Sequence, residues 1–296
     1  MITARPLVES DLDAVVDLLH AYDRRWFGEP LLSAADVRAE WSAPAFELAV
    51  DGEGWDEDGE LVAFGTLSTR GAVELAVRDD WAGAGLEAAV LDRWEAEARR
   101  RGLEKLHRDL PAADAESRAL LESRGWVVLR TGWMLQLDPG TPVETRELPE
   151  GYVVRPMRPS DARAAYDVII GAFARYGQTR PYEDWRAGTM DRPDVTTEHC
   201  FVATWRDEVV GACLLVDPVG GVGHGAEAWV PQVAVAQGHR RQGLARELLA
   251  RTTLAARARG VPGLALYTNT ETGALGLYER FGMVVRHTLV ECSLTL

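Results

Sequence analysis

The sequence contains an internal repeat, because four blocks from the first half of the chain recur in the same order in the second half. The matched blocks, first copy and then second, are residues 4–7 with 154–157, 59–63 with 207–211, 85–102 with 243–260, and 120–126 with 277–283. Four matches in one order indicate a duplicated structural unit. The chain of 296 residues is long enough for two domains that each bury a core.

The boundary between the copies is expected where turn-forming residues cluster among charged ones. Three prolines and a glycine lie between residues 139 and 149 and interrupt any helix or strand pattern there. We therefore predict a first domain over residues 1–140, a linker over 141–150 and a second domain over 151–296.

The composition is that of a folded globular protein, with 47% hydrophobic and 26% charged residues, so disorder is not expected. No stretch stays apolar over the length that a membrane-spanning helix needs, and the first residues lack the pattern of a signal peptide. These features predict a cytoplasmic protein. A monomer and a homodimer both remain open.

The negative charge of the chain lies in its first half. Residues 1–148 hold 30 acidic and 16 basic side chains, whereas residues 149–296 hold 16 of each, so the net charge of −14 belongs to the first copy. An acidic domain repels polyanions, which argues against nucleic acid or an anionic membrane as a partner. Solubility alone could also account for this acidity. The neutral second half offers an anionic ligand less repulsion.

The three cysteines do not indicate a metal or redox site. Cys200, Cys213 and Cys292 have spacings that fit neither a zinc site nor a C-x-x-C pair. Two of them lie in apolar runs that resemble strands, which predicts buried packing. No metal is expected.

The pattern of the second half predicts the alternating strands and helices of a mixed α/β layer fold. A hairpin is expected around Asp207 and Glu208, and a strand over residues 226–235 leads into a helix over 243–259. The other predicted elements are strands near 152–157, 199–206, 209–216 and 263–268, helices near 160–172, 182–190 and 274–281, and a pair of closing strands over 283–295. In the first half, the acidic segment 51–60 is expected to be a loop.

The junction between that strand and that helix reads V-A-Q-G-H-R-R-Q-G-L-A over residues 235–245. The first N–H groups of a helix have no partner within the helix, and the helix dipole adds positive potential at the same end. The junction is therefore predicted to bind a phosphate group. The simpler alternative is a solvated helix N-terminus with exposed arginines.

These residues resemble the GNAT superfamily of acyl-CoA-dependent N-acetyltransferases. The resemblance rests on Arg240-x-x-Gly243-x-Ala245 at the junction and on Leu-Tyr-Glu-Arg-x-Gly over residues 277–282. It covers the whole second half and, more weakly, the first. Two such domains in one chain resemble the tandem GNAT proteins, a group that includes mycothiol synthase. The implied fold class is α/β, with two tandem GNAT-like mixed-sheet domains, each a central, mostly antiparallel sheet flanked by helices.

The resemblance implies that the second domain binds acetyl-CoA as a cosubstrate. The backbone at Val233 and Val235 would pair with the pantetheine arm, as in strand addition to an exposed edge. Gly243 would let the backbone of the junction come close to the pyrophosphate. The residues expected to bind the cofactor are Val233, Ala234, Val235, Arg240, Arg241, Gln242, Gly243, Leu244, Ala245, Arg246, Asn269 and Tyr278.

The same resemblance assigns catalytic roles. Tyr278 matches the position whose hydroxyl protonates the departing thiolate in many family members, and a neutral O–H donor suits that step. Helix packing is the alternative role for this tyrosine. The amine must lose a proton before it attacks, and Glu227 is the first candidate for the base, with His224 and Glu291 behind it.

The first copy differs at the positions that matter for this chemistry. Arg240 corresponds to Ala82, Ala245 to Glu87 and Tyr278 to Leu121. A carboxylate at the junction would repel a pyrophosphate, and leucine has no proton to donate. We therefore expect a degenerate first domain that serves as scaffold.

The expected function is transfer of an acetyl group from acetyl-CoA to a primary amine, by direct attack in the second domain. The acceptor is expected to be a small molecule, although its identity stays open. Two alternatives remain at this point: a protein N-acetyltransferase, and a non-catalytic acyl-CoA-binding protein.

Overall fold

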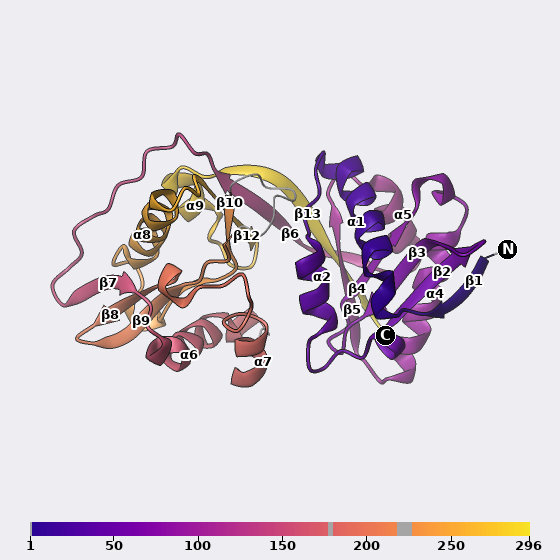
Figure 1. Ribbon diagram of the computed structural model, residues 1–296, viewed down its shortest axis with the longest axis horizontal. Coiled ribbons are helices and arrows are strands. Elements are labelled where there is room, and N and C mark those ends of the chain that lie inside the picture. The colour runs from indigo at the N-terminus through magenta and orange to yellow at the C-terminus, as the bar shows by residue number, and fades with distance from the viewer. Residues whose placement is uncertain (1, 177–179, 218–226) are drawn as a thin grey trace. The chain divides into compact units, whose positions relative to one another are not determined.

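The computed structural model describes residues 2–176, 180–217 and 227–296, and its chain divides into two compact units (Figure 1). Unit 1 comprises the chain up to Gly132 together with His287–Leu296, and unit 2 comprises Trp133–Arg286. Each unit has its own buried core.

Unit 1 is built on an antiparallel sheet with the strand order β1-β2-β3-β4. The strands are β1 (Ile2–Pro6), β2 (Gly52–Glu57), β3 (Glu60–Leu67) and β4 (Val73–Val77). The loop predicted over residues 51–60 is therefore wrong, since most of it is strand β2. Strand β2 pairs with β1 on one side and β3 on the other despite its glycines and acidic side chains, and the turn is confined to Asp58 and Gly59.

Helices cover both faces of this sheet. Alternate residues of β3 point to opposite sides, so Phe64 packs with α1 (Leu12–Phe27) and α2 (Ala34–Trp41), whereas Ala63 packs with α4 (Leu86–Arg100). The remaining elements are the short helix α3 (Leu48–Asp51), strand β5 (Lys105–Pro111) and helix α5 (Ala115–Ser123).

Unit 2 repeats this plan with the strand order β11-β9-β8-β7. Its antiparallel strands are β7 (Tyr152–Pro156), β8 (Phe201–Trp205), β9 (Glu208–Cys213) and β11 (Val233–Val235), and its helices are α6 (Ala162–Phe173), α7 (Tyr182–Ala187) and α8 (Leu244–Ala258). The predicted hairpin is confirmed, and Arg206 and Asp207 take the positive φ angles of a tight turn. In Figure 1, α6 and α8 lie on opposite sides of these strands.

Unit 2 also contains a parallel strand pair. Strand β10 (Glu227–Val230) pairs with β12 (Gly263–Asn269), and β12 has β6 (Val127–Leu137) as its other neighbour. Helix α9 (Leu275–Phe281) follows β12. These elements match the mixed α/β fold predicted from the sequence.

The two copies of the repeat exchange their last strands. Strand β13 (Val284–Thr295) ends the second copy but pairs with β5 of the first copy, within unit 1. Strand β6 ends the first copy, yet its residues from Trp133 onward belong to unit 2. The compact units thus differ from the predicted division at 140 and 151, because the chain changes unit within two strands. The predicted pair of closing strands is also wrong, since residues 284–295 form one strand.

Among the residues that the structure describes, no helix is both long and apolar enough to cross a membrane. Nor does that part of the chain bring together three His, Cys, Asp or Glu side chains in a way that could hold a metal ion. The three cysteines are unpaired and buried, as the packing interpretation predicts. Burial raises the pKa of the Cys200 thiol to about 11 and that of Cys213 to about 12.

The close packing of α4 on β3 can be tested at Gly65. A Cβ atom there would clash with Nε1 of Trp94 and lie 2.7 Å from Cγ1 of Val90, and both of these side chains are fully buried. We expect Gly65→Ala to lower the free energy of unfolding by about 1–3 kcal/mol, measured by chemical denaturation of the full chain. Gly140→Ala, where the added Cβ meets nothing within 4 Å, is the control and should be nearly neutral. Equal stability of both variants would contradict the packing described here.

Candidate active site

The central feature of the site is a strand that changes sheets. Residues 227–230 form β10 and pair with β12, whereas residues 233–235 form β11 and pair with β9. On the side away from β12, Trp229 exchanges hydrogen bonds with Val216, so β10 has a neighbour on both sides, whereas β11, which begins after Pro231 and Gln232, pairs with β9 alone. Beyond this point β11 and β12 belong to different sheets, and β11 is an edge strand.

The free edge of β11 presents specific backbone groups. Leu214 N donates to Gln232 O and Ala236 N donates to Val210 O, which fixes the alternation of the ladder with β9. In an antiparallel pair the intervening residues point the other way. The backbone groups of Val233 and Val235 therefore face away from β9. Among the residues that the structure describes, Val235 O alone of these groups has a partner, Arg240 Nε at 3.1 Å.

A turn with two left-handed residues follows β11. After the 3₁₀ turn Gln237–His239, Arg241 has φ 63° and Gly243, the N-cap of α8, has φ 83°. In the described part of the chain, the backbone N–H groups from Arg241 to Ala245 donate no hydrogen bond. The turn thus leaves a run of unsatisfied donors at the positive end of a 15-residue helix.

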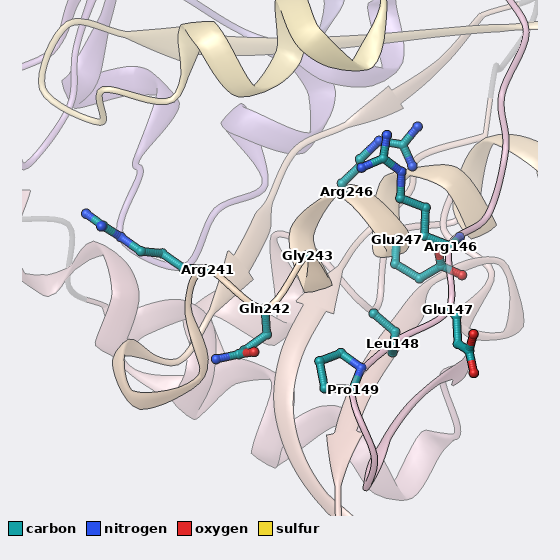
Figure 2. A pocket seen from close by; sticks show the side chains of 9 residues that line it. All are labelled: Arg146, Glu147, Leu148, Pro149, Arg241, Gln242, Gly243, Arg246 and Glu247. Carbon is teal, nitrogen blue, oxygen red and sulfur yellow. The ribbon is translucent and has the colours of Figure 1, made fainter.

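A pocket of about 320 Å³ adjoins this turn (Figure 2). One wall is formed by the turn and the start of α8, and the other by the segment that precedes β7. The lining residues are Arg146, Glu147, Leu148, Pro149, Arg241, Gln242, Gly243, Arg246 and Glu247. Three arginines make the pocket attractive to an anion.

Two acidic side chains, Glu147 and Glu247, also line the pocket, and the second is already engaged. Glu247 is almost fully buried, and its carboxylate accepts from Arg251 Nε at 2.8 Å and from the backbone N–H of Arg146 at 2.7 Å. By contrast, the guanidinium groups of Arg146 and Arg241 have no hydrogen bond or ion pair within the described residues. Residues 146–149 were not expected to line a pocket, because their prolines and alternating charges indicated only a linker.

Tyr278 lies on α9 with 6% of its surface exposed. Its pKa is raised, first by burial and then by the neighbouring Cys213 thiol, so the hydroxyl keeps its proton well beyond neutral pH. Cys213 is the partner of Val233 in the ladder between β9 and β11. No hydrogen bond of the Tyr278 hydroxyl is present in the described part of the chain, which leaves this donor available.

Asn269 ends β12 and is buried. Its Oδ1 accepts a hydrogen bond from Thr272 N at 3.3 Å, so the side chain stabilises the loop that leads to α9. This local contact accounts for the asparagine without a ligand.

The three candidate bases have different surroundings. The Glu227 carboxylate accepts from Arg286 Nη1 at 3.1 Å and from the Gln136 amide. His224 lies outside the described residues. Glu291 belongs to unit 1, where Arg130 holds it in a bidentate ion pair with distances of 2.6 and 2.7 Å.

Unit 1 contains the same turn without its arginines. A 3₁₀ turn (Asp79–Trp81), two left-handed residues and α4 follow β4 at positions 158 residues before their counterparts in unit 2. At the positions of Arg240, Arg241 and Arg246, unit 1 has the small residues Ala82, Gly83 and Ala88. The backbone is conserved between the copies, whereas the positive charge is not.

An ion pair occupies the corresponding place in unit 1. Glu87, the counterpart of Ala245, accepts from Arg108 Nη1 at 2.6 Å and from Ser117 Oγ at 3.3 Å. Arg108 is 4% exposed and stands where β12 has Leu266. Two large charged side chains thus fill the space beside this turn, and the carboxylate would repel a phosphate.

Comparisons with known proteins agree with this geometry. Residues 163–283 match the acetyltransferase (GNAT) family. No curated protein matches the sequence significantly. A GCN5-related N-acetyltransferase from Sphaerobacter thermophilus is 26% identical with a TM-score of 0.83, and the match covers 99% of this chain and 95% of that one.

Two further solved structures share the fold. A tandem GNAT protein from the clavulanic acid biosynthesis pathway has a TM-score of 0.75 at 15% identity and covers 100% of this chain and 98% of its own. A GCN5-related glucosamine N-acetyltransferase region of a fungal multi-domain β-N-acetylglucosaminidase has a TM-score of 0.73 at 18% identity, over 99% of this chain and 38% of that one.

The family match and the shared fold support an acyltransferase. Residues 163–283 of unit 2 form an acetyltransferase (GNAT) family domain, and the whole chain shares its fold with a tandem GNAT protein. This confirms the resemblance and the fold class inferred from the sequence.

The role of the Arg241 side chain can be tested, because its backbone adopts a left-handed conformation that glycine also accepts. Arg241 adopts a backbone conformation that costs a non-glycine residue about 1–2 kcal/mol, and the first copy has Gly83 there. We expect Arg241→Gly to leave thermal stability unchanged or slightly raised while weakening coenzyme A binding about fivefold. Arg206→Gly, at another left-handed arginine, should match it in stability but bind coenzyme A normally. Equal binding by both variants would show that the Arg241 side chain has no part in the site.

Proposed function

We propose that the chain is an N-acetyltransferase that transfers an acetyl group from acetyl-CoA to a primary amine of a small molecule in unit 2. The observation that carries the proposal is the placement of an unpaired strand edge, at Val233 and Val235, directly before a turn of free N–H groups. A linear ligand with an amide-containing arm and a pyrophosphate fits both features at once.

The residues present fit coenzyme A at this place. The N–H groups from Arg241 to Ala245 would hold the pyrophosphate, and Gly243 supplies the left-handed angle that aims them. Ala245, which replaces the Glu87 of unit 1, leaves the approach open and uncharged. Arg240 and Arg246 would add positive charge on either side of the turn, and Gln242 and Leu244 would contribute backbone donors.

Tyr278 is the proposed acid. Bound acetyl-CoA supplies an activated thioester, and its sulfur must take up a proton when the bond to the acetyl group breaks. The Tyr278 hydroxyl has its proton available, because burial raises its pKa and no described side chain accepts from it. Its neighbour Cys213 pairs with Val233, which puts the hydroxyl beside the proposed pantetheine path.

The base is proposed to act through water. Glu227 stands at the start of β10, six residues before Val233, or about 20 Å along an extended strand. Its partners Arg286 and Gln136 hold it as a carboxylate in a fixed orientation. A chain of water molecules would carry the proton of the amine to this carboxylate.

We propose that unit 1 binds no acyl-CoA. Its turn lacks all three arginines, and the Glu87–Arg108 pair fills the adjacent space. The Leu121 at the place of Tyr278 is fully buried and packs in the core of unit 1. Unit 1 then serves as a scaffold that keeps the backbone geometry of the site without its chemistry.

The role of the turn in unit 2 can be tested against the matching turn of unit 1. Gly243→Glu and Gly85→Glu impose the same left-handed strain and the same charge change, because both glycines have φ 83° and open surroundings. We expect Gly243→Glu to abolish release of free thiol from acetyl-CoA across a panel of small amines. Gly85→Glu should keep the wild-type rate. Turnover that survives Gly243→Glu would place the cofactor elsewhere.

The acid can be tested separately. We expect Tyr278→Phe to lower kcat about 10²-fold with little change in KM for acetyl-CoA, since the ring packing is kept and only the proton donor is lost. Tyr176→Phe, on the 3₁₀ turn Ala174–Tyr176, is the control. Because the pKa of Tyr278 is raised from its usual value, the wild-type rate should show no alkaline fall up to about pH 10. A wild-type rate retained by Tyr278→Phe would exclude this role.

A further inference from the structure

We infer that the segment before β7 is part of the cofactor site, and that Arg146 binds the 3′-phosphate of coenzyme A. This inference rests on the proposed function and extends it to a residue outside the GNAT-matched region 163–283. The evidence is the way the segment is attached, the charges it brings to the pocket, and the absence of these charges from the first copy.

Hydrogen bonds with residues of α8 hold the segment in place. Arg257 donates to the carbonyl oxygens of Thr141 and Asp138 at 2.8 and 3.1 Å, and Arg246 Nη1 donates to Glu144 O at 3.1 Å. The buried Glu247 carboxylate accepts the Arg146 N–H at 2.7 Å. Four side-chain to backbone hydrogen bonds thus fix the path of residues 138–146, and Val143 and Leu148 pack on the core of unit 2.

This attachment places Arg146 beside Arg246. Both line the pocket, and Figure 2 shows their side chains extending on the same side of the turn, whereas Arg241 extends on the opposite side. The Arg146 side chain is exposed and makes no ion pair within the described residues. Two guanidinium groups on one side of a pocket repel each other unless an anion lies between them.

The chemistry of the ligand supplies such an anion. With the pyrophosphate on the N–H groups of the turn, the part of coenzyme A that extends beyond it is the adenosine with its 3′-phosphate. A dianionic phosphate accepts paired N–H donors from guanidinium groups, and arginine suits it better than lysine does. Arg241, on the other side, remains near the pyrophosphate.

The first copy supports the assignment by contrast. The counterparts of Arg246 and Glu247 are Ala88 and Ala89, so α4 has neither the second arginine nor the anchor for such a segment. The anchor Glu247, the segment 138–146 and the paired arginines all belong to unit 2, the copy whose turn is proposed to bind phosphate.

The test compares coenzyme A with dephospho-coenzyme A, which differs only in lacking the 3′-phosphate, by calorimetric titration of the full chain. The wild type should bind coenzyme A about tenfold more tightly, or ~1.4 kcal/mol. Arg146→Ala should remove this difference by weakening coenzyme A alone. The anchor to Glu247 uses the backbone N–H of residue 146, so it survives the substitution, and unchanged thermal stability will verify that. Arg38→Ala, at an exposed arginine of unit 1, controls for net charge.

The outcomes separate the two proposals. If Arg146→Ala weakens both nucleotides equally, the effect is general electrostatics and the 3′-phosphate assignment is overturned. If it weakens neither, the segment is only a linker, and the assignment is again overturned while the proposed function stands. If the wild type binds neither nucleotide, the proposed function itself fails and this inference falls with it.

Discussion

The structure of the site depends on one constraint in the backbone, the separation of β11 from β12 after β10 ends at Val230. Because β10 pairs with β12 and β11 pairs with β9, the backbone of β11 is left unpaired on one side. The chain then turns through Arg241 and Gly243 into α8, whose first N–H groups have no partner among the described residues. An extended edge and a polar turn in sequence form a continuous set of donors and acceptors for an elongated anionic ligand.

The repeat shows which parts of this arrangement belong to the fold and which to function. Both units have the same 3₁₀ turn, the same left-handed positions and a helix of the same length, so the turn geometry by itself is a property of the fold. Beside this turn, unit 2 has arginines and a small alanine, Ala245, whereas unit 1 has the Glu87–Arg108 ion pair. The two copies therefore differ in side chains rather than in backbone at this turn, and the proposed division into a binding copy and a scaffold copy rests on those side chains.

Local patterns predicted much of this from the sequence. The turn, helix α8 and the hairpin at Arg206 and Asp207 each follow from neighbouring residues, and their positions agree with the structure. The exchange of β6 and β13 could not be predicted in this way, because both strands have the same pattern and nothing local selects the partner strand. Strand β2 was missed because its glycines and acidic residues oppose strand formation, and pairing on both sides overrides that preference. The pocket wall at Arg146 was missed because long-range hydrogen bonds to α8 fix it.

The central claim is that one turn of the two binds the cofactor, and hydrogen exchange at the backbone amides tests it most directly. The N–H groups proposed as phosphate donors are those whose exchange with solvent should slow when coenzyme A is added. The account predicts protection over residues 241–245 and over the β11 edge, with no change over residues 83–87. Equal protection of both turns, or protection of the first turn alone, would contradict it.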